Sequence, residues 1–481
     1  MADSETALTI DIGSTFTKAR LFDLDKVELV AASQSPTTVE KDINIGINRA
    51  LDRIPDWKKA GIKLACSSAA GGLKIVASGL VKNLTTEAAR RAALGAGARL
   101  VGTFCYELTD EDIEDMEAHY PDILLLAGGT DGGEKEIVLK NAEKIAGSEL
   151  DQPVIFAGNR SIKSQVARKF SRAGQKYHIV ENVMPEVGEL NIKPTREKIR
   201  EVFLDRIVRA RGLDRVKDIV DRVVMPTPAA VLNSASLLQE GTDSVEGLGE
   251  LMIIDIGGAT TDVHSAADGR PEDESLIQRG LEEPFLKRTV EGDIGLRYSA
   301  GSLVEVSSTE RLSDLYENLY QDEFPADKLY DYVEAIVERP DSLPEGELEQ
   351  RFDIVLACEA VRIASSRHAG EVSSVYTPQG EEYVLRGKDL SGIDSVIGTG
   401  GIMAMSSEPG AILSGVKYDN QLSPETLTPR DPRLYLDENY LLPALGLLGE
   451  ERKEESIQLM KKYIISLKSR GGLLTDGATQ K

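Results

Sequence analysis

Several apolar runs in the chain stop abruptly at small, hydroxylated and acidic residues. Residues 251–265, LMIIDIGGATTDVHS, show this pattern, and residues 7–23, ALTIDIGSTFTKARLFD, show it near the start of the chain. A short apolar run bounded by turn residues predicts a buried strand, and the returning polar and apolar stretch predicts a second strand after a tight turn. Together with residues 25–34, DKVELVAASQ, the first copy predicts a three-stranded meander.

The pattern changes between residues 40 and 220. Short β-rich runs alternate there with longer amphipathic stretches such as EKEIVLKNAEKIAG (134–147). Strands that alternate with helices predict α/β organisation. The β-rich runs are IKLACSS (62–68), ARLVGTF (98–104), DILLLAGGT (122–130) and PVIFAGN (153–159).

Residues 193–217 form a basic stretch in an otherwise acidic chain, with nine Lys or Arg against four Asp or Glu. Ile199, Phe203, Ile207 and Val208 give this stretch one apolar helix face. We interpret it as a solvated helix whose charges pair along the helix. A docking surface for an acidic partner is the alternative.

A second domain is expected to begin near residue 226, where MPTPAAVLNSASLLQEG (225–241) predicts a helix entered by proline. Later patterns predict helices over 302–368, a hairpin over 372–388 and helices over 440–468. The expected divisions are an N-terminal domain (1–225), a second domain (226–425) and a C-terminal helical segment with a frayed tail (426–481).

Length and charge restrict the function classes. A chain of 481 residues suits two domains, and a formal net charge of −24 makes nucleic acid and anionic lipid poor partners. The widely spaced Cys66, Cys105 and Cys358 favour free thiols over a disulfide framework or a zinc site. No signal-like N-terminus and no apolar run near the roughly 18 residues of a bilayer span are present, so we expect a cytoplasmic protein with no membrane partner.

The two strand–turn–strand stretches are copies of one unit with chemical consequences. Glycine lets the backbone approach an anion closely, and turn amides and hydroxyls supply converging donors. An ordinary Gly/Thr turn explains either copy alone, but the repetition favours a pair of phosphate-binding hairpins. The candidate phosphate ligands are Gly13, Ser14, Thr15, Thr17 and Lys18 in the first copy, and Gly257, Gly258, Thr260 and Thr261 in the second.

Each copy also places an aspartate, Asp11 or Asp255, at the end of its first strand. Two carboxylates beside a polyanion require a divalent cation between them, and Mg²⁺ with retained waters fits. Asp11 and Asp255 are therefore the candidate metal ligands and catalytic residues. A third glycine turn, VIGTGGIMAM (396–405), is typical of a strand end that accepts adenosine against bare backbone, through Gly398, Thr399, Gly400 and Gly401.

This order of motifs resembles the superfamily of acetate and sugar kinases, heat-shock chaperones and actin. MPTPAAVLNSA (225–235) is similar to the connector helix that precedes the second phosphate strand in the chaperones. The resemblance covers about residues 7–415. It implies an α/β protein with two ribonuclease H-like domains of the actin-like ATPase fold, which close on ATP in a central cleft.

One departure from the chaperones concerns hydrolysis. They carry a glutamate immediately before the connector Pro-Thr, whereas Met225 precedes Pro226 here. Asp11, Asp255 or Asp262 would have to assist the attacking water, and slow turnover is expected.

Further strings resemble the MutL/GlmL family, the accessory proteins of glutamate mutase and related cobalamin-dependent aminomutases. The strings are ACSSAAGGLKIVASGL (65–80), LLLAGGTDGGE (124–134), ENVMPEVGELN (181–191) and SSRHAGEV (365–372). The resemblance implies a chaperone-like ATPase that reactivates such a mutase by promoting exchange of damaged cofactor. The mutase is the expected partner, and whether the protein forms a homo-oligomer stays open.

Two other functions fit the same fold: a small-molecule kinase and an ATP-dependent actin-like scaffold. The glycine loop after residue 127 is either a further anion site or a structural support, and we favour the support. DVHSAADG (262–269) falls short of a cobalamin loop, because Ala267 occupies its glycine position. The remaining histidines, His119, His178 and His368, are expected to be structural, whereas Arg362 and Arg367 suit either a helix end or the nucleotide cleft.

Overall fold

The computed structural model describes residues 5–13, 15–38, 42–68, 73–210, 219–271, 273, 275–378, 380–419 and 425–467, without the side chains of 204–210 and 222–224. The predicted Ser14, the end of the basic stretch (211–217) and the predicted tail (471–481) lie outside these residues. Two compact units make up the chain. Unit 1 comprises residues 1–247, 278–288 and 442–460, and unit 2 comprises residues 248–277, 289–441 and 461–481.

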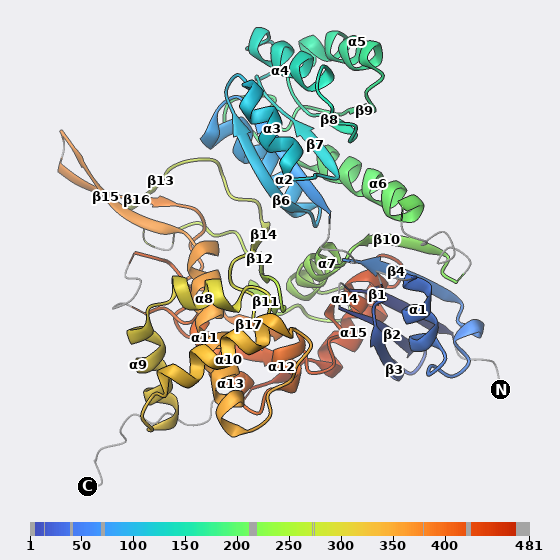
Figure 1. The fold of residues 1–481 in the computed structure, drawn as a ribbon, viewed down its shortest axis with the longest axis vertical. Helices are drawn as coiled ribbons and strands as arrows, with labels where there is room; N and C mark the ends of the chain where they lie inside the picture. Colours follow the sequence, from blue (N-terminus) through green and yellow to red (C-terminus); the bar gives the residue numbers. More distant parts are fainter. Residues whose placement is uncertain are drawn as a thin grey trace. The chain divides into compact units, whose positions relative to one another are not determined.

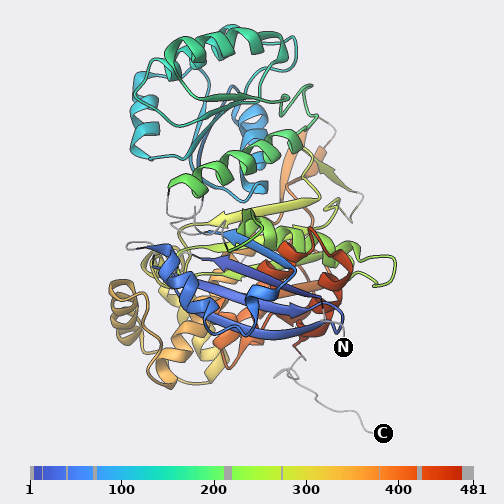
Figure 2. The ribbon, with the colours of Figure 1, turned by 90° about the vertical axis from the view of Figure 1, so that its right-hand side faces the viewer.

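Unit 1 contains a five-stranded sheet in the order β10-β4-β1-β2-β3 (Figure 1). Its strands are β1 (Thr6–Ile12), β2 (Phe16–Asp23), β3 (Glu28–Pro36), β4 (Ile62–Ser67) and β10 (Arg222–Pro226). β1, β2 and β3 form the predicted antiparallel meander, which lies broadside in Figure 2, whereas β4 and β10 run parallel to β1. Apolar residues alternate between the two faces, so that α1 (Ile43–Leu51) packs on one face, and α7 (Thr227–Glu240) and α14 (Leu442–Leu448) pack on the other.

A second sheet of unit 1 is wholly parallel, in the order β6-β5-β7-β8-β9. Its strands are β5 (Lys74–Gly79), β6 (Arg99–Cys105), β7 (Ile123–Leu126), β8 (Val154–Phe156) and β9 (Tyr177–Ile179). Helices cover both faces, as a parallel sheet requires (Figures 1 and 2). α2 (Glu87–Gly95) and α6 (Lys193–Ala210) pack on one face, and α3 (Asp110–Ala118), α4 (Glu136–Ala146) and α5 (Lys163–Ala173) pack on the other. The predicted α/β organisation is therefore confirmed.

Unit 2 repeats the arrangement of the first sheet in the order β14-β12-β11-β17-β18-β19. Its strands are β11 (Leu251–Ile256), β12 (Thr261–Ala266), β14 (Leu286–Glu291), β17 (Ser395–Thr399), β18 (Arg433–Leu436) and β19 (Ile465–Ser466). The predicted hairpin after residue 371 joins a separate sheet made of β13 (Leu276–Gln278), β16 (Gly380–Arg386) and β15 (Glu371–Thr377). The helices of unit 2 are α8 (Ala300–Val306), α9 (Thr309–Tyr320), α10 (Ala326–Glu338), α11 (Glu347–His368), α12 (Gly401–Met405) and α13 (Pro409–Leu413). Most of α15 (Lys453–Tyr463) belongs to unit 1. The short helical turns are η1 (Trp57–Lys59), η2 (Lys82–Thr86) and η3 (Arg160–Ile162) in unit 1, and η5 (Ser414–Val416) in unit 2.

The two sheets share one strand order, β3-β2-β1-β4-β10 in unit 1 and β14-β12-β11-β17-β18 in unit 2. In each, the first strand pairs antiparallel with the second and parallel with the fourth. This order is that of the ribonuclease H-like domain. Two such domains in one chain confirm the predicted actin-like ATPase fold.

The division into units differs from the expected domain boundaries of 225/226 and 425/426. α7 belongs to unit 1, because it packs on β4, β10 and α14. The expected C-terminal segment is also divided: β18 pairs with β17 in unit 2, whereas α14 packs on α7 in unit 1. The packing of α7 on β4 and on α14 joins residues more than 150 positions apart, which local sequence patterns do not reveal.

In the part of the chain that the structure describes, no helix has both the length and the apolar character needed to cross a membrane.

The close packing of α14 on α7 predicts that a methyl group added at Gly446 strongly lowers the stability of the protein. A Cβ added to Gly446 would lie 1.9 Å from the Ala230 carbonyl oxygen, so one of the two helices would have to move. We expect Gly446→Ala to lower the free energy of unfolding by about 1–3 kcal/mol, as measured by urea denaturation. In the control Gly61→Ala, the added Cβ would meet only the Thr6 carbonyl oxygen, at 3.9 Å. Equal stabilities of the two variants would contradict the packing.

Candidate functional site

The β1–β2 hairpin forms the first predicted phosphate turn. Register places Asp11 opposite Lys18 and Ile12 opposite Thr17. The Gly13 amide donates to the Phe16 carbonyl at 3.1 Å, and a Cβ at Gly13 would lie 2.7 Å from that oxygen. The turn therefore requires glycine at this position. Thr15 is exposed beside it.

The Asp11 carboxylate is buried at the carboxyl ends of parallel strands, with 5% of the residue exposed. Thr227, the first residue of α7, donates its hydroxyl to Asp11 Oδ1 at 2.7 Å. Cys66, opposite Asp11 on β4, directs its thiol to the same oxygen at 3.5 Å. The first hairpin, β4 and the connector helix are thus joined at one carboxylate oxygen.

Cys66 is held as a protonated thiol at this position. Burial raises the pKa of the Cys66 thiol well above its usual value, and the negative charge of Asp11 raises it further. A thiol that stays protonated serves as a weak donor to Asp11 and is a poor nucleophile. Its contribution to this site is therefore structural.

Met225 occupies the end of β10, where the chaperone pattern has glutamate. The register aligns it with Cys66 on β4, and its side chain is buried with Leu64, Ala229 and Leu447. An apolar side chain therefore fills this position, where the heat-shock chaperones have a carboxylate.

The β11–β12 hairpin of unit 2 forms the second predicted phosphate turn. Asp255 lies opposite Asp262, and the Gly257 amide donates to the Thr260 carbonyl at 2.9 Å, as Gly13 does to Phe16. Thr260 donates its hydroxyl to Asp262 Oδ2 at 3.1 Å. Asp255 is only partly buried, so its carboxylate is more accessible than that of Asp11.

The glycine turn after β17 lies directly beside Asp255. β17 pairs with β11, so that Thr399 lies opposite Asp255. Gly400 has φ +110°, and a Cβ there would lie 2.4 Å from the Ile256 carbonyl oxygen and 3.1 Å from Asp255 Oδ1. Gly401 follows at the exposed start of α12, and an added Cβ would contact nothing within 4 Å. Unit 2 thus brings together the second phosphate turn and the predicted adenosine turn.

Three of the predicted hydroxyl ligands have partners inside their own unit. Thr17 Oγ1 lies 2.9 Å from Thr37 Oγ1, and Thr261 donates to the Ile294 carbonyl at 2.8 Å. Thr399 donates to Asp437 Oδ2 at 2.9 Å. All three side chains are fully buried, so their hydroxyls shape the turns and do not face a ligand. Gly398 is buried as well, packed beside Met403 and Leu413.

The glycine loop after β7 is a structural support, as favoured from the sequence. The Gly132 amide donates to Asn159, and the Asp131 and Gly133 amides donate to backbone carbonyls. Asn182 donates to the Gly129 carbonyl and to Asp131. Because these amides already have acceptors, the loop does not offer them to an anion.

The histidines and arginines of unit 2 that the sequence singled out lie in its core or in ion pairs. His368 is fully buried between Thr289 and Ser265, each at 2.8 Å, and His264 is a buried residue of β12. Arg362 pairs with the buried Glu359.

Arg367 lies at the end of α11 and pairs with Asp293 and Glu291. Burial raises the pKa of Glu291, and nearby Asp262 and Asp293 act in the same direction, while Arg367 opposes them. Arg367 thus holds an acidic pair whose charges interact with the second hairpin.

Sequence reasoning missed three residues that position the site: Thr227, Cys66 and Asp437. Asp437 is buried, accepts from Thr399 and also accepts from the Leu441 amide just before α14. Thr227 and Cys66 stand in strings that were noted for other reasons. A polar residue at the end of each parallel strand was the available signal for all three.

Among the described residues, no group of three or more His, Cys, Asp or Glu side chains is arranged to hold a metal ion.

A family model described as MutL protein matches residues 7–464. The chain is also 44% identical over 466 residues to Protein MutL of Clostridium tetanomorphum. The aligned region covers 96% of this chain and 99% of that relative. The chain belongs to the MutL family. The resemblance found in the sequence motifs is thereby confirmed.

Solved structures similar to this MutL-family chain include the activator of a dehydratase and a sugar-acid kinase. The activator of 2-hydroxyisocaproyl-CoA dehydratase from Clostridium difficile with bound ADPNP has a TM-score of 0.31, 12% identity, and coverage of 95% of this chain and 97% of that chain. Gluconate kinase from Lactobacillus acidophilus has a TM-score of 0.35, 9% identity, and coverage of 97% and 93%. At TM-scores below 0.5, the fold assignment rests on the repeated strand order and not on these similarities.

The three thiols of this MutL-family protein are predicted to differ in reactivity. Cys66 and Cys358 are buried, and burial raises the pKa of Cys358 to about 11, whereas Cys105 is partly exposed. At pH 8 we expect a thiol-reactive reagent to label Cys105 in the native protein and to label the other two only after denaturation. Peptide mapping identifies the labelled thiol. Rapid native labelling of Cys66 would contradict its placement beside Asp11.

Proposed function

We propose that the protein binds and slowly hydrolyses Mg²⁺-ATP and uses it to reactivate a cobalamin-dependent aminomutase such as glutamate mutase. The repetition of one aspartate at the same topological position of both sheets, Asp11 on β1 and Asp255 on β11, carries this proposal. Each aspartate ends the central strand that pairs with the second and fourth strands of its sheet. Each is followed by a glycine turn with one amide-to-carbonyl bond.

The proposed phosphate ligands are backbone amides and accessible side chains of the two turns. In unit 1 these are Gly13, Thr15 and Lys18, together with the predicted Ser14. In unit 2 they are Gly257, Gly258 and Thr260. Gly400 and Gly401 are proposed to accept the adenosine, because Gly400 lies beside Asp255, Gly401 is exposed next to it, and neither has a side chain. Turn amides and one lysine are suited to the distributed charge of a triphosphate.

The residues present also fit a magnesium ion. Asp11 is a buried carboxylate, and the donors that contact it are a neutral hydroxyl and a neutral thiol. Burying an ionised carboxylate is costly without a cation or several donors, so a metal ion would stabilise it. Asp11 and Asp255 would hold the ion, whose charge would offset that of the phosphates during transfer.

Slow hydrolysis follows from the apolar end of β10. Met225 supplies no carboxylate to orient water, which leaves Asp11, Asp255 and Asp262 for that role. Removing a positioned general base typically costs about 10²–10⁴-fold in rate. Low turnover suits an accessory protein, whose output is a change in its partner.

The accessory role and the mutase partner are supported by the family membership and by the motifs that resemble MutL/GlmL proteins. A small-molecule kinase would need an acceptor group in addition to the ATP turns, and ATP consumption that depends on an added metabolite would favour it. ATP-dependent pelleting of the pure protein would favour an actin-like scaffold.

For the site itself, we expect Asp255→Ala to lower Mg²⁺-dependent ATP hydrolysis by more than about tenfold, because it removes one of the two proposed metal ligands. Release of phosphate from ATP is the measurement. Asp268→Ala, at an exposed aspartate that follows β12, is the matched control and should keep the rate. Equal rates for both variants would remove Asp255 from the catalytic site.

For the accessory role, glutamate mutase is first inactivated with a damaged cobalamin bound. Addition of this protein with ATP, Mg²⁺ and intact cofactor should restore mutase activity. The Asp255→Ala variant should restore little, and omission of ATP none. Full ATP hydrolysis without recovery of glutamate mutase or of related aminomutases would separate the ATPase from the proposed partner.

A further inference from the structure

One short segment of unit 2, residues 292–299 between β14 and α8, holds the second phosphate turn. Three successive carbonyls of the turn accept hydrogen bonds from this segment. The bonds are Leu296 N to the Gly257 carbonyl at 3.1 Å, Arg297 N and Tyr298 N to the Gly258 carbonyl at 2.8 and 2.9 Å, and Ser299 Oγ to the Ala259 carbonyl at 2.9 Å. The contact is close, because a Cβ added to Gly295 would lie 2.3 Å from the Ala259 carbonyl carbon. We call residues 292–299 the support segment.

The bonds to these carbonyls determine where two amides of the turn point. A trans peptide group is planar, so its N–H points away from its own C=O. The Gly257 carbonyl shares a peptide group with the Gly258 amide, and the Gly258 carbonyl shares one with the Ala259 amide. Both amides therefore point away from the support segment. Neither amide has a hydrogen-bond acceptor in the part of the chain that the structure describes, so both are available to an anion.

A buried ion pair anchors the support segment. The Arg297 guanidinium donates to both carboxylate oxygens of Asp353, from Nη1 at 3.0 Å and from Nη2 at 2.8 Å. The two side chains are 13% and 2% exposed. Nη1 also donates to the Leu296 carbonyl at 2.7 Å, and a Cβ added to Gly258 would lie 3.4 Å from Arg297 Cβ. A forked pair fixes the plane of the guanidinium, so the backbone of the segment is held beside the turn.

Asp353 connects this ion pair to the helical core of unit 2. It lies on α11 and accepts a further hydrogen bond from the Tyr332 hydroxyl of α10, at 2.8 Å. Burial raises the pKa of Tyr332, and the charge of Asp353 raises it further, so the hydroxyl stays protonated and donates. Burial acts to lower the pKa of Arg297, but the hydrogen bonds to Asp353 outweigh it and hold this pKa above its usual value. Asp353 is thus a buried carboxylate with its donors in place, and the core determines its position.

We propose that Arg297 is a positioning residue for the phosphates of ATP, which acts through the support segment on the amides of Gly258 and Ala259. This role rests on the proposed function, because it requires that ATP binds at this turn. Arg297 itself contacts no nucleotide atom in this role, since Asp353 occupies its guanidinium. Amides that are held in position before an anion arrives bind it best, because no reorganisation is then needed. Loss of the Arg297–Asp353 pair therefore weakens binding of the phosphates and not of the adenosine.

The test is equilibrium binding of Mg²⁺-ATP and of adenosine to full-length Arg297→Gln, each measured by displacement of a fluorescent ATP analogue. Glutamine is uncharged and cannot form the forked pair with Asp353. We expect the Kd for ATP to rise by about tenfold and the Kd for adenosine to change by less than about twofold, because adenosine has no phosphate. Arg297→Lys keeps one charged contact with Asp353 and should recover part of the affinity for ATP.

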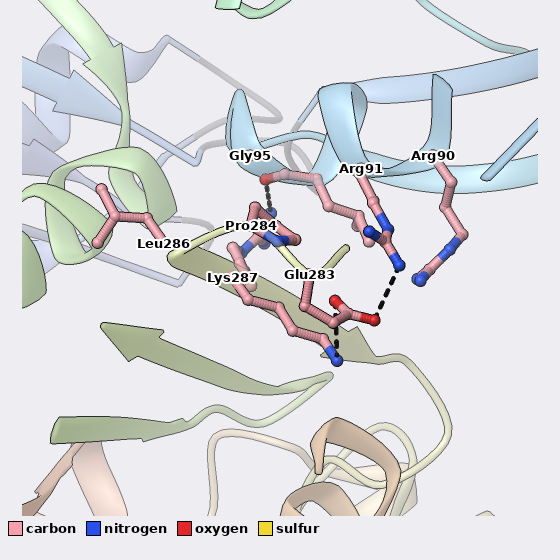
Figure 3. Close-up of a pocket in the computed structure, with 9 residues that line it drawn as sticks. Arg90, Arg91, Gly95, Glu283, Pro284, Leu286 and Lys287 are labelled. Carbon is pink, nitrogen blue, oxygen red and sulfur yellow. Dashed lines mark hydrogen bonds and ion pairs between the residues drawn. The ribbon is translucent and has the colours of Figure 1, made fainter. Parts of the chain in front are cut away.

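Arg91→Gln in unit 1 is the matched control. Figure 3 shows Arg91 paired with Glu283 beside α2, at 2.8 Å, and Arg91 also donates to the Glu282 carbonyl at 2.6 Å. Both side chains of this pair are 8% exposed, so the control breaks a buried pair of the same kind. The hydrogen bonds of Arg91 are to Glu87, Glu282 and Glu283, and none is to a phosphate turn. We expect this variant to bind ATP and adenosine as the unmodified protein does.

The outcomes separate this role from the proposed function. Equal affinity of Arg297→Gln and the unmodified protein for ATP would overturn the positioning role and leave the ATP site in place. Equal losses of affinity for ATP and for adenosine would also overturn it, because they indicate a general loss of structure. Absence of ATP binding by the unmodified protein would refute the proposed function and this role together. If Arg297→Gln fails to fold, Arg297→Lys carries the test: a loss of affinity for ATP alone supports the role, and no loss overturns it.

Discussion

The buried carboxylate of Asp11 is the constraint on which the architecture of unit 1 depends. An ionised carboxylate removed from water costs several kcal/mol unless donors and a cation satisfy it. Here the donors come from Thr227 and Cys66, which are 216 and 55 positions away in the sequence. Satisfying Asp11 therefore fixes where α7 begins and which residue of β4 lies beside β1. The turn at Gly13 is held in place by the same strands.

In unit 2, the aspartate at the equivalent strand end has different hydrogen-bond surroundings. Asp255 ends the equivalent strand, but its neighbour on the fourth strand, Thr399, donates to Asp437 and not to the aspartate. Asp437 then accepts from the Leu441 amide just before α14, much as Thr227 stands at the start of α7. Asp255 is consequently left more accessible than Asp11. The repeat is one of strand order, and the partners of the two carboxylates are not interchangeable.

Local sequence patterns predicted the elements that neighbouring residues alone determine. Both hairpins, the connector helix and the glycine turn at Gly400 follow from apolar runs and from backbone conformations that require glycine. The pairing of Thr227 with Asp11, or of Thr399 with Asp437, depends on strand order and was not predicted. For the same reason the sequence placed α7 in the second domain. The hydroxyls of Thr17 and Thr261 were assigned to phosphate, and Thr399 to adenosine, because composition does not tell which face of a strand is buried.

The apolar side chain of Met225 keeps a second carboxylate away from the buried Asp11. The end of β10 lies next to Cys66, which in turn contacts Asp11, so a glutamate at residue 225 would place a second carboxylate near the first in a buried environment. Two buried carboxylates so close repel each other, and one of them gains a raised pKa or requires a further cation. The apolar side chain packs with Leu64, Ala229 and Leu447 and removes this repulsion. The same substitution removes the acid that would orient water. In this chain the stability of the Asp11 site and the slow hydrolysis of ATP that we propose would therefore both result from one residue.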